Sequence, residues 1–384
     1  MAHCMIIHSA RRLDARGTVG DFWLASKDGT ITDTGTGDGW RRLHRDRTLV
    51  TDAGGGWLTA GFIDMHQHGG GGADYEHGHD GIRRGLATHR AHGTTRSLLS
   101  LVSAPIDYLV ESLATIATLA DPFVIGSHLE GPFLAPSHRG AHDESMLLQP
   151  DPTTIARLIE AGGGTLRLVT LAPELPGAMA AIEQFVRAGV VVAIGHTDAD
   201  AAVAREAMNR GATVLTHAFN GMNGIQHRAP GPVAVAVADE RVTLELILDG
   251  IHVHPEAALL LLRAAKGRVA LITDAMAAAG SEDGTYDLGG QPVVVVDGVA
   301  RLAGGTRSIA GSTLTQDVAL RFAIIRLGID PVDAIPTLTT VPATALGIGD
   351  RFGLLEPGFV ADAVLLSDDF TVRTVWAAGR APAG

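Results

Sequence analysis

The sequence is poor in cysteine and has no long apolar run, and each shortage excludes a class of structure. Cys4 is the single cysteine among 384 residues, so an internal disulfide and a thiolate metal cluster are both excluded. This cysteine usage is typical of a reducing compartment, and we expect a cytoplasmic protein. The opening residues, MAHCMIIHSARR, lack the apolar segment of a secretory signal. We expect no membrane span, because no uncharged apolar stretch of about 18 residues occurs.

Positive charge is also scarce. The chain has 42 acidic and 30 basic residues, and its formal net charge of -12 disfavours nucleic acid as a partner. Lys27 and Lys266 are the only lysines, so nearly all basic residues are arginine. The length and the hydrophobic content of 46% are those of a large globular α/β enzyme.

Short apolar runs alternate with Ala/Leu/Arg-rich helical stretches over residues 59–344. This alternation is typical of repeated βα units and a parallel sheet. Most of the runs end on a polar or ionisable residue, as in a (β/α)8 barrel, whose active site lies at the carboxyl ends of the strands. We therefore predict an α/β fold with a TIM-like barrel as the catalytic domain. The eight predicted strand runs are GFIDMH, TTRSLLSL, FVIGSHLEG, LRLVTLAPE, VVVAIGHT, TVLTHAFN, TLELILDGIH and VALITDA.

The two ends of the chain show no long helical pattern. Residues 1–58 contain short strands and turns, and residues 345–384 contain two or three further strands. We predict that these segments are the two parts of one small β-sandwich domain.

His66 and His68 form an HxH pair directly after the apolar run GFID. Residues two apart in an extended strand point to the same side, so both imidazoles can reach one metal ion. The alternative is that two unrelated polar residues leave the strand here. Because this strand end is a barrel strand end, a metal-binding pair is favoured.

Three more candidate ligands end other predicted strands. Glu130 ends the third run, and a carboxylate leaving an apolar strand is costly to desolvate unless it is paired or binds a cation. His196 and His217 end the fifth and sixth runs. Each histidine alone could be a core residue bonded to a carbonyl, but together they predict a metal site. Nitrogen and oxygen ligands without thiolate fit zinc, and also iron or manganese.

Asp274 ends the eighth run, LITDAM, and is the candidate acid/base. Metal-assisted hydrolysis needs a group that accepts a proton from water and returns it to the leaving nitrogen, and a carboxylate beside the metal can do so. The alternative is a helix N-cap, a position that favours Asp. That alternative leaves the predicted metal site without a proton shuttle.

The motifs HxH, EGPF…GAH, GHT, THAFNGM, DGIHVHP, TDAM and AGSTLT follow one another along the chain. Their order resembles that of the N-acetylglucosamine-6-phosphate deacetylases of the amidohydrolase superfamily, and the similarity covers nearly the whole chain. The resemblance implies that Glu130, His196 and His217 hold the main metal and that Asp274 is the catalytic residue. His66 and His68 would add a second ion, although some family members lack these histidines and use one ion.

The same resemblance implies an amino-sugar phosphate substrate and a homodimer or higher homo-oligomer. Arg228 and His252 suit a sugar phosphate dianion, because cationic groups pair with phosphate oxygens; the alternative for Arg228 is a surface charge. His142 could polarise the amide carbonyl or bind a sugar hydroxyl. The implied substrate contacts are Ala141, His142, Asn220, Gly221, Arg228, His252, Ile309, Ala310 and Gly311.

Four alternative functions have to be compared with this one, and the sequence argues against the first three. Many cyclic amidases bridge their metals with a carboxylated lysine on the fourth strand, but Lys27 and Lys266 lie far from that run. Nucleobase deaminases share the strand-end histidines but lack the EGPF…GAH segment. A barrel that has lost activity and serves as a scaffold would not need every ligand. The same deacetylation of N-acetylgalactosamine 6-phosphate remains open.

Overall fold

The computed structural model describes residues 3–304 and 308–381. The chain divides into two compact units. One unit combines both ends of the chain with His89–Arg96, and the other comprises Asp64–Thr88 and Ser97–Thr315. Three helices near the C-terminal end belong to the first unit: α8 (Gln316–Arg321), α9 (Pro331–Ala334) and α10 (Thr340–Ala345).

Eight strands form the sheet of a nearly closed parallel barrel, which confirms the predicted architecture. Each predicted apolar run overlaps one strand of this sheet, in chain order, and only Ala212 of β13 lies outside its run. The strands read as continuous apolar runs because helices cover their outer faces. The strands are β6 (Phe62–Asp64), β9 (Thr94–Leu101), β10 (Val124–Glu130), β11 (Leu166–Leu171), β12 (Val191–Ile194), β13 (Ala212–Leu215), β14 (Thr243–Ile247) and β15 (Val269–Ile272).

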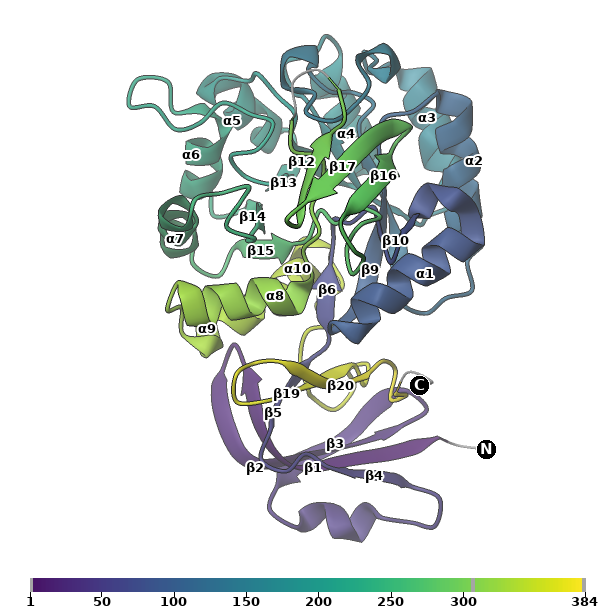
Figure 1. Cartoon of the computed structure of the whole chain (residues 1–384), viewed down its shortest axis with the longest axis vertical. Helices are drawn as coiled ribbons and strands as arrows, with labels where there is room; N and C mark the ends of the chain where they lie inside the picture. The colour runs from purple at the N-terminus through teal and green to yellow at the C-terminus, as the bar shows by residue number, and fades with distance from the viewer. Residues whose placement is uncertain (1–2, 305–307, 382–384) are drawn as a thin grey trace. The chain divides into compact units, whose positions relative to one another are not determined.

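Helices α2 to α7 lie outside these strands (Figure 1). Helix α2 buries Leu109, Leu113 and Ile116, whose spacing places them on one face. The helices are α1 (Gly78–Ala91), α2 (Ile106–Ala117), α3 (Pro152–Ala161), α4 (Ala178–Arg187), α5 (Ala201–Asn209), α6 (Gly231–Ala238) and α7 (Pro255–Ala264). Among the described residues, no helix has both the length and the apolar character needed to cross a membrane.

The first and last strand ends of the barrel are joined by hydrogen bonds. The Asp274 N–H donates to the carbonyl oxygen of His66 at 2.9 Å, and the Thr273 hydroxyl donates to the buried Asp64 carboxylate at 2.7 Å. These bonds bring the residues after β6 next to those after β15. Candidate site residues from opposite ends of the barrel sequence therefore become neighbours.

Strands from both ends of the chain form one seven-stranded sheet, which is consistent with the small β domain that the sequence predicts for these segments. Strand β5 pairs with β1 in parallel and with β19 in antiparallel orientation. Leu24, Leu58, Leu365 and Trp376 share its apolar core. The strands are β1 (Cys4–Asp14), β2 (Gly17–Lys27), β3 (Thr30–Thr36), β4 (Leu49–Asp52), β5 (Trp57–Ala60), β19 (Ala363–Leu366) and β20 (Val372–Trp376).

A three-stranded antiparallel sheet follows β15, and the sequence analysis did not anticipate it. Its strands are β16 (Gly284–Leu288), β17 (Gln291–Val296) and β18 (Val299–Leu302). Leu288 and Val293 pack in one apolar cluster with Val102 and Met276. The turn after β16 is thereby fixed against the segment that follows barrel strand β9.

A buried ion pair joins β9 to the residue before β19. Arg96 donates through Nε and Nη2 to the two oxygens of Asp362, at 2.7 and 2.9 Å. The Ala378 N–H and the Thr95 hydroxyl also donate to this carboxylate. A two-point contact of this kind is strong only while both partners are present.

We predict that Arg96→Met lowers the free energy of unfolding by about 3–5 kcal/mol, because the Asp362 carboxylate stays buried without its counter-charge. The control is Arg157→Met, which removes an exposed pair with Asp107 and should cost less than about 1 kcal/mol. Urea titration followed by circular dichroism measures both values. Equal costs for the two variants would contradict this role of the buried pair.

Candidate metal centre and active site

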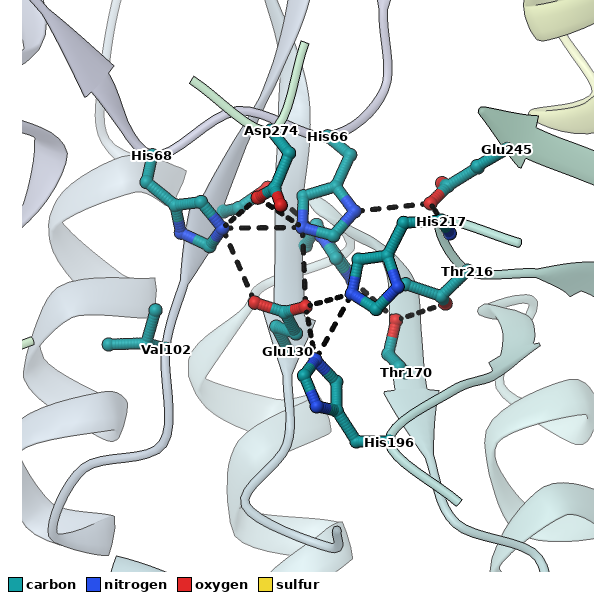
Figure 2. Close-up of polar contacts among 12 residues, drawn as sticks. His66, His68, Val102, Glu130, Thr170, His196, Thr216, His217, Glu245 and Asp274 are labelled. Carbon is teal, nitrogen blue, oxygen red and sulfur yellow. Dashed lines mark hydrogen bonds and ion pairs between the residues drawn. The ribbon is translucent and has the colours of Figure 1, made fainter. Parts of the chain in front are cut away.

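Six predicted residues leave the carboxyl ends of barrel strands and meet in one cluster (Figure 2). Glu130 is the last residue of β10, and the others follow their strands within four residues. All six are buried or nearly so. The structure thus brings together the HxH pair, the three other candidate ligands and the candidate acid/base, which are His66, His68, Glu130, His196, His217 and Asp274.

Glu130 lies at the centre of this cluster. Its Oε1 is 3.0 Å from Nε2 of His196 and 3.0 Å from Nε2 of His217, and those two nitrogens are 3.1 Å apart. Its Oε2 is 3.3 Å from Nε2 of His68, which lies 3.2 Å from Nε2 of His66. Ligand atoms about 2.0–2.1 Å from a tetrahedral zinc ion are separated by roughly 3.3 Å. The spacing therefore fits atoms that share a cation.

The other ring nitrogen of most of these histidines has a hydrogen-bond acceptor. An acceptor at Nδ1 places the proton there and leaves Nε2 free to bind a metal. The pairs are His196 with the carbonyl of His138 at 2.8 Å, His217 with the carbonyl of Asn220 at 3.1 Å, and His66 with Glu245 Oε2 at 3.1 Å. Because Nε2 of His196 faces Nε2 of His217, two lone pairs would oppose each other unless a cation or a proton lies between them.

The backbone is strained where it delivers these side chains. His196, His217 and Asp274 have φ angles of 46°, 24° and 49°, in the left-handed region that residues other than glycine rarely adopt. Gly221 makes room for one of them, since a Cβ there would lie 2.9 Å from Nδ1 of His196. Asp274 starts no helix among the described residues, so the N-cap alternative is wrong.

The electrostatics of the cluster favour a cation. Burial opposes charge on His68, but hydrogen bonds to Asp274 and Glu130 outweigh it and raise its pKa to about 9. Burial would raise the pKa of Asp274, yet His66 and His68 lower it to about 2. Metal ions compete with protons for the same nitrogens. A cluster that attracts protons this strongly also attracts a divalent cation, and its buried His, Glu and Asp donors fit one.

His142 lies beside the cluster as a hydrogen-bond donor. The Ser103 N–H donates to its Nδ1 at 3.2 Å, so the ring proton is on Nε2, which lies 3.4 Å from Glu130 Oε2. Burial lowers the pKa of His142, which favours the neutral ring. A neutral imidazole with a fixed Nε2–H can donate to an oxygen in the pocket.

A cavity of about 300 Å³ opens onto Glu130, His196, His217 and Asp274. Most of the predicted substrate residues line it: Ala141, His142, Asn220, Gly221, His252, Ile309 and Gly311. Ala310 is buried behind this wall. Arg228 is exposed, on the loop before α6, and is not among the residues that line the cavity.

Several residues of the site were not predicted from the sequence. Glu245 holds His66, and Asp249 holds Nδ1 of His252 at 2.6 Å. A charged residue inside the apolar run TLELIL was a signal for Glu245, and the motif DGIHVHP was one for Asp249. Leu288 and Gly289 also line the cavity, but they come from the unanticipated sheet and carried no signal.

The sequence model of the amidohydrolase family matches residues 57–381. An N-acetylgalactosamine-6-phosphate deacetylase of Escherichia coli O157:H7 is 36% identical over 381 residues, which cover 98% of each chain. An N-acetylglucosamine-6-phosphate deacetylase of Bos taurus is 34% identical, over 86% of this chain and 84% of the relative.

Solved structures agree with these matches. An N-acetyl-D-glucosamine-6-phosphate deacetylase variant of Mycobacterium smegmatis, in complex with N-acetyl-D-glucosamine 6-phosphate, superposes with a TM-score of 0.91. It is 39% identical and the match covers 99% of both chains. The N-acetylglucosamine-6-phosphate deacetylase of Pasteurella multocida superposes with a TM-score of 0.93 at 25% identity, over 99% of this chain and 100% of that chain.

We predict that Gly221→Ala weakens metal binding by about 10- to 100-fold, because the new Cβ collides with the His196 ring and the φ of +59° strains alanine. Gly224→Ala is the matched control, since a Cβ at that position meets nothing within 4 Å. Equilibrium dialysis against zinc, with metal analysis, measures the affinities. Unchanged affinity in Gly221→Ala would show that the His196 ring tolerates displacement.

Proposed function

We propose that this chain hydrolyses N-acetyl-D-glucosamine 6-phosphate to D-glucosamine 6-phosphate and acetate. The chain belongs to the amidohydrolase family and, within it, to the N-acetylglucosamine-6-phosphate deacetylases. This reaction would serve amino-sugar catabolism and the recycling of cell-wall sugars. The observation that carries the proposal is the convergence of His196, His217 and Glu130 beside Asp274 at one cavity. Relatives with this activity match nearly the full chain.

The proposed cofactor is a divalent metal, with Zn²⁺ favoured by the donor set and Fe²⁺ or Mn²⁺ as alternatives. Glu130, His196 and His217 would hold the main ion, and His66 and His68 would hold a second. When bound, such an ion polarises a carbonyl and lowers the pKa of water. The short contacts around Glu130 support the shared ligand.

Asp274 is the proposed proton shuttle. Its low pKa keeps it ionised near neutral pH, so it is ready to accept a proton from the attacking water. It then returns this proton to the sugar nitrogen as the amide bond breaks. His142 would donate its Nε2–H to the acetamide oxygen as negative charge develops there.

Recognition of the sugar phosphate is proposed for the remaining lining residues. His252, held by Asp249, faces the cavity together with Asn220 and Gly221. Arg228 lies on an exposed loop, which suits a role at the site of a second copy of the chain. We also propose the homodimer or higher homo-oligomer that the family resemblance implies, in which Arg228 of one subunit would complete the phosphate site of another.

The second candidate substrate is N-acetylgalactosamine 6-phosphate, which differs at one hydroxyl. The match to the Escherichia coli relative of that name, over 98% of both chains, favours it specifically. The cyclic amidase and deaminase alternatives have no such support. Neither Lys27 nor Lys266 is among the cavity-lining residues.

The test of the function is acetate release from the 6-phosphates of N-acetylglucosamine, N-acetylgalactosamine and N-acetylmannosamine, with defined metals added back. We expect the highest kcat/KM for the glucosamine epimer and a fall of about 10²- to 10⁴-fold in kcat for Asp274→Asn. Metal content of that variant should stay near wild type. No acetate release from any of the three by metal-loaded wild type would refute the proposed function.

We predict that Arg228→Ala lowers kcat/KM for the phosphorylated substrate by roughly 10- to 100-fold, the value of a hydrogen bond to a charged group. The unphosphorylated sugar should be unaffected. Arg205→Ala, which removes an exposed arginine on α5, is the control. Equal losses with both sugars would remove Arg228 from the phosphate site.

A further inference from the structure

Glu245 is a fully buried carboxylate in the middle of β14, and the proposed mechanism does not use it. Its Oε2 accepts two hydrogen bonds, one from Nδ1 of His66 at 3.1 Å and one from the N–H of His217 at 3.3 Å. Figure 2 shows it on the side of the His66 ring away from Glu130. One oxygen atom therefore contacts a ligand from each half of the metal cluster.

The other oxygen of Glu245 has no hydrogen-bond partner among the described residues. A buried carboxylate with an unsatisfied oxygen is costly, and an apolar side chain would suit the run that contains Leu244 and Leu246 better. The presence of a charge at this position needs a reason other than stability. The contacts of Oε2 supply that reason, because they determine where two metal ligands point.

We propose that Glu245 is a positioning residue that couples the two halves of the metal site and sets the affinity for the cation at His66 and His68. The proposal rests on the two-ion site of the proposed function. A carboxylate at Nδ1 fixes the ring of a ligating histidine and makes Nε2 a stronger donor. The same carboxylate holds the backbone of His217, a ligand of the first ion.

His66 is also held from its other side. Its ring packs edge-on against His128, with centroids 4.6 Å apart. Nδ1 and Nε2 of His128 each lie 2.9 Å from a hydroxyl, those of Ser100 and Thr170. His128 therefore cannot turn without breaking two hydrogen bonds, so the His66 ring lies between a fixed edge and the Glu245 carboxylate.

His68 lacks a comparable anchor. Its buried Nδ1 has no partner among the described residues. Of the two histidines in the HxH pair, only His66 therefore has a carboxylate at Nδ1 among the described residues. Glu245 thus supplies the carboxylate contact at Nδ1 in the second metal subsite, which is why it should affect the metal affinity there.

Charge supports the same conclusion. Glu130, Asp274 and Glu245 bring three carboxylates to one cluster of histidines. With neutral histidines, the three carboxylates and one divalent cation have a net charge of −1, and a second cation changes it to +1. Replacing the charge of Glu245 by a neutral group should therefore weaken the second ion more than the first.

The test is stepwise metal titration of chelator-treated wild type, Glu245→Gln and Glu245→Leu, followed by equilibrium dialysis with zinc and by the visible spectrum with Co²⁺. Glutamine keeps an oxygen for the His66 Nδ1–H but lacks the charge, whereas leucine removes both. We expect the second ion to bind about 10- to 100-fold more weakly in Glu245→Gln, with the first ion close to wild type. Leucine should abolish the second step.

Glu240→Gln, an exposed glutamate just before β14, is the matched control and should titrate as wild type. Because leucine can disturb folding, the proposal is judged on the Glu245→Gln variant. Far-UV circular dichroism of each protein checks that it is folded. Wild-type second-ion affinity in Glu245→Gln would overturn the proposal, as would a wild type that binds only one ion. Acetate release is not the readout, so failure of the deacetylase function would be seen separately.

Discussion

The site depends on one buried carboxylate. Glu130 has histidine nitrogens close to both of its oxygens, and no lysine or arginine forms an ion pair with it among the described residues. A buried carboxylate is tolerated only if a positively charged group or ion lies next to it. His196, His217 and the HxH pair therefore have to converge on it, and this requirement fixes the relative position of three strand ends.

The strand ends meet this requirement through strained and close-packed backbone. His196, His217 and Asp274 all take positive φ angles, which redirect their side chains from the strand axis toward the shared centre. Gly221 permits the approach of the loop after β13 to the His196 ring. The proposed functional residues thus have backbone conformations that local propensity disfavours, and the surrounding barrel holds them there.

The sequence predicted the barrel because its strands are buried on both faces and read as apolar runs. It also predicted the convergence of Glu130, His196, His217 and Asp274, since the carboxyl ends of parallel strands meet at one end of a barrel. It did not predict β16–β18, because alternating short strands inside a βα pattern carry no signal of where they pack. The exposed position of Arg228 and the Ser103 contact that sets the tautomer of His142 depend on loop conformation, which spacing alone does not determine.

The polar residues next to the proposed metal ligands form a network of their own. Hydroxyl and imidazole groups of Ser100, His128, Thr170 and Thr216 form a continuous hydrogen-bonded chain in the barrel, where branched apolar side chains would be usual. Such a network is tolerable only when its members are satisfied, and each of these contacts is 2.9 Å long. The chain runs from Ser100, which accepts from the N–H of Gln67 between the HxH histidines, to Thr216, the neighbour of His217. Hydrogen bonds are directional, whereas apolar contacts allow side chains to repack, so this layer fixes the relative position of the two segments that carry the proposed ligands in a way that an apolar core would not.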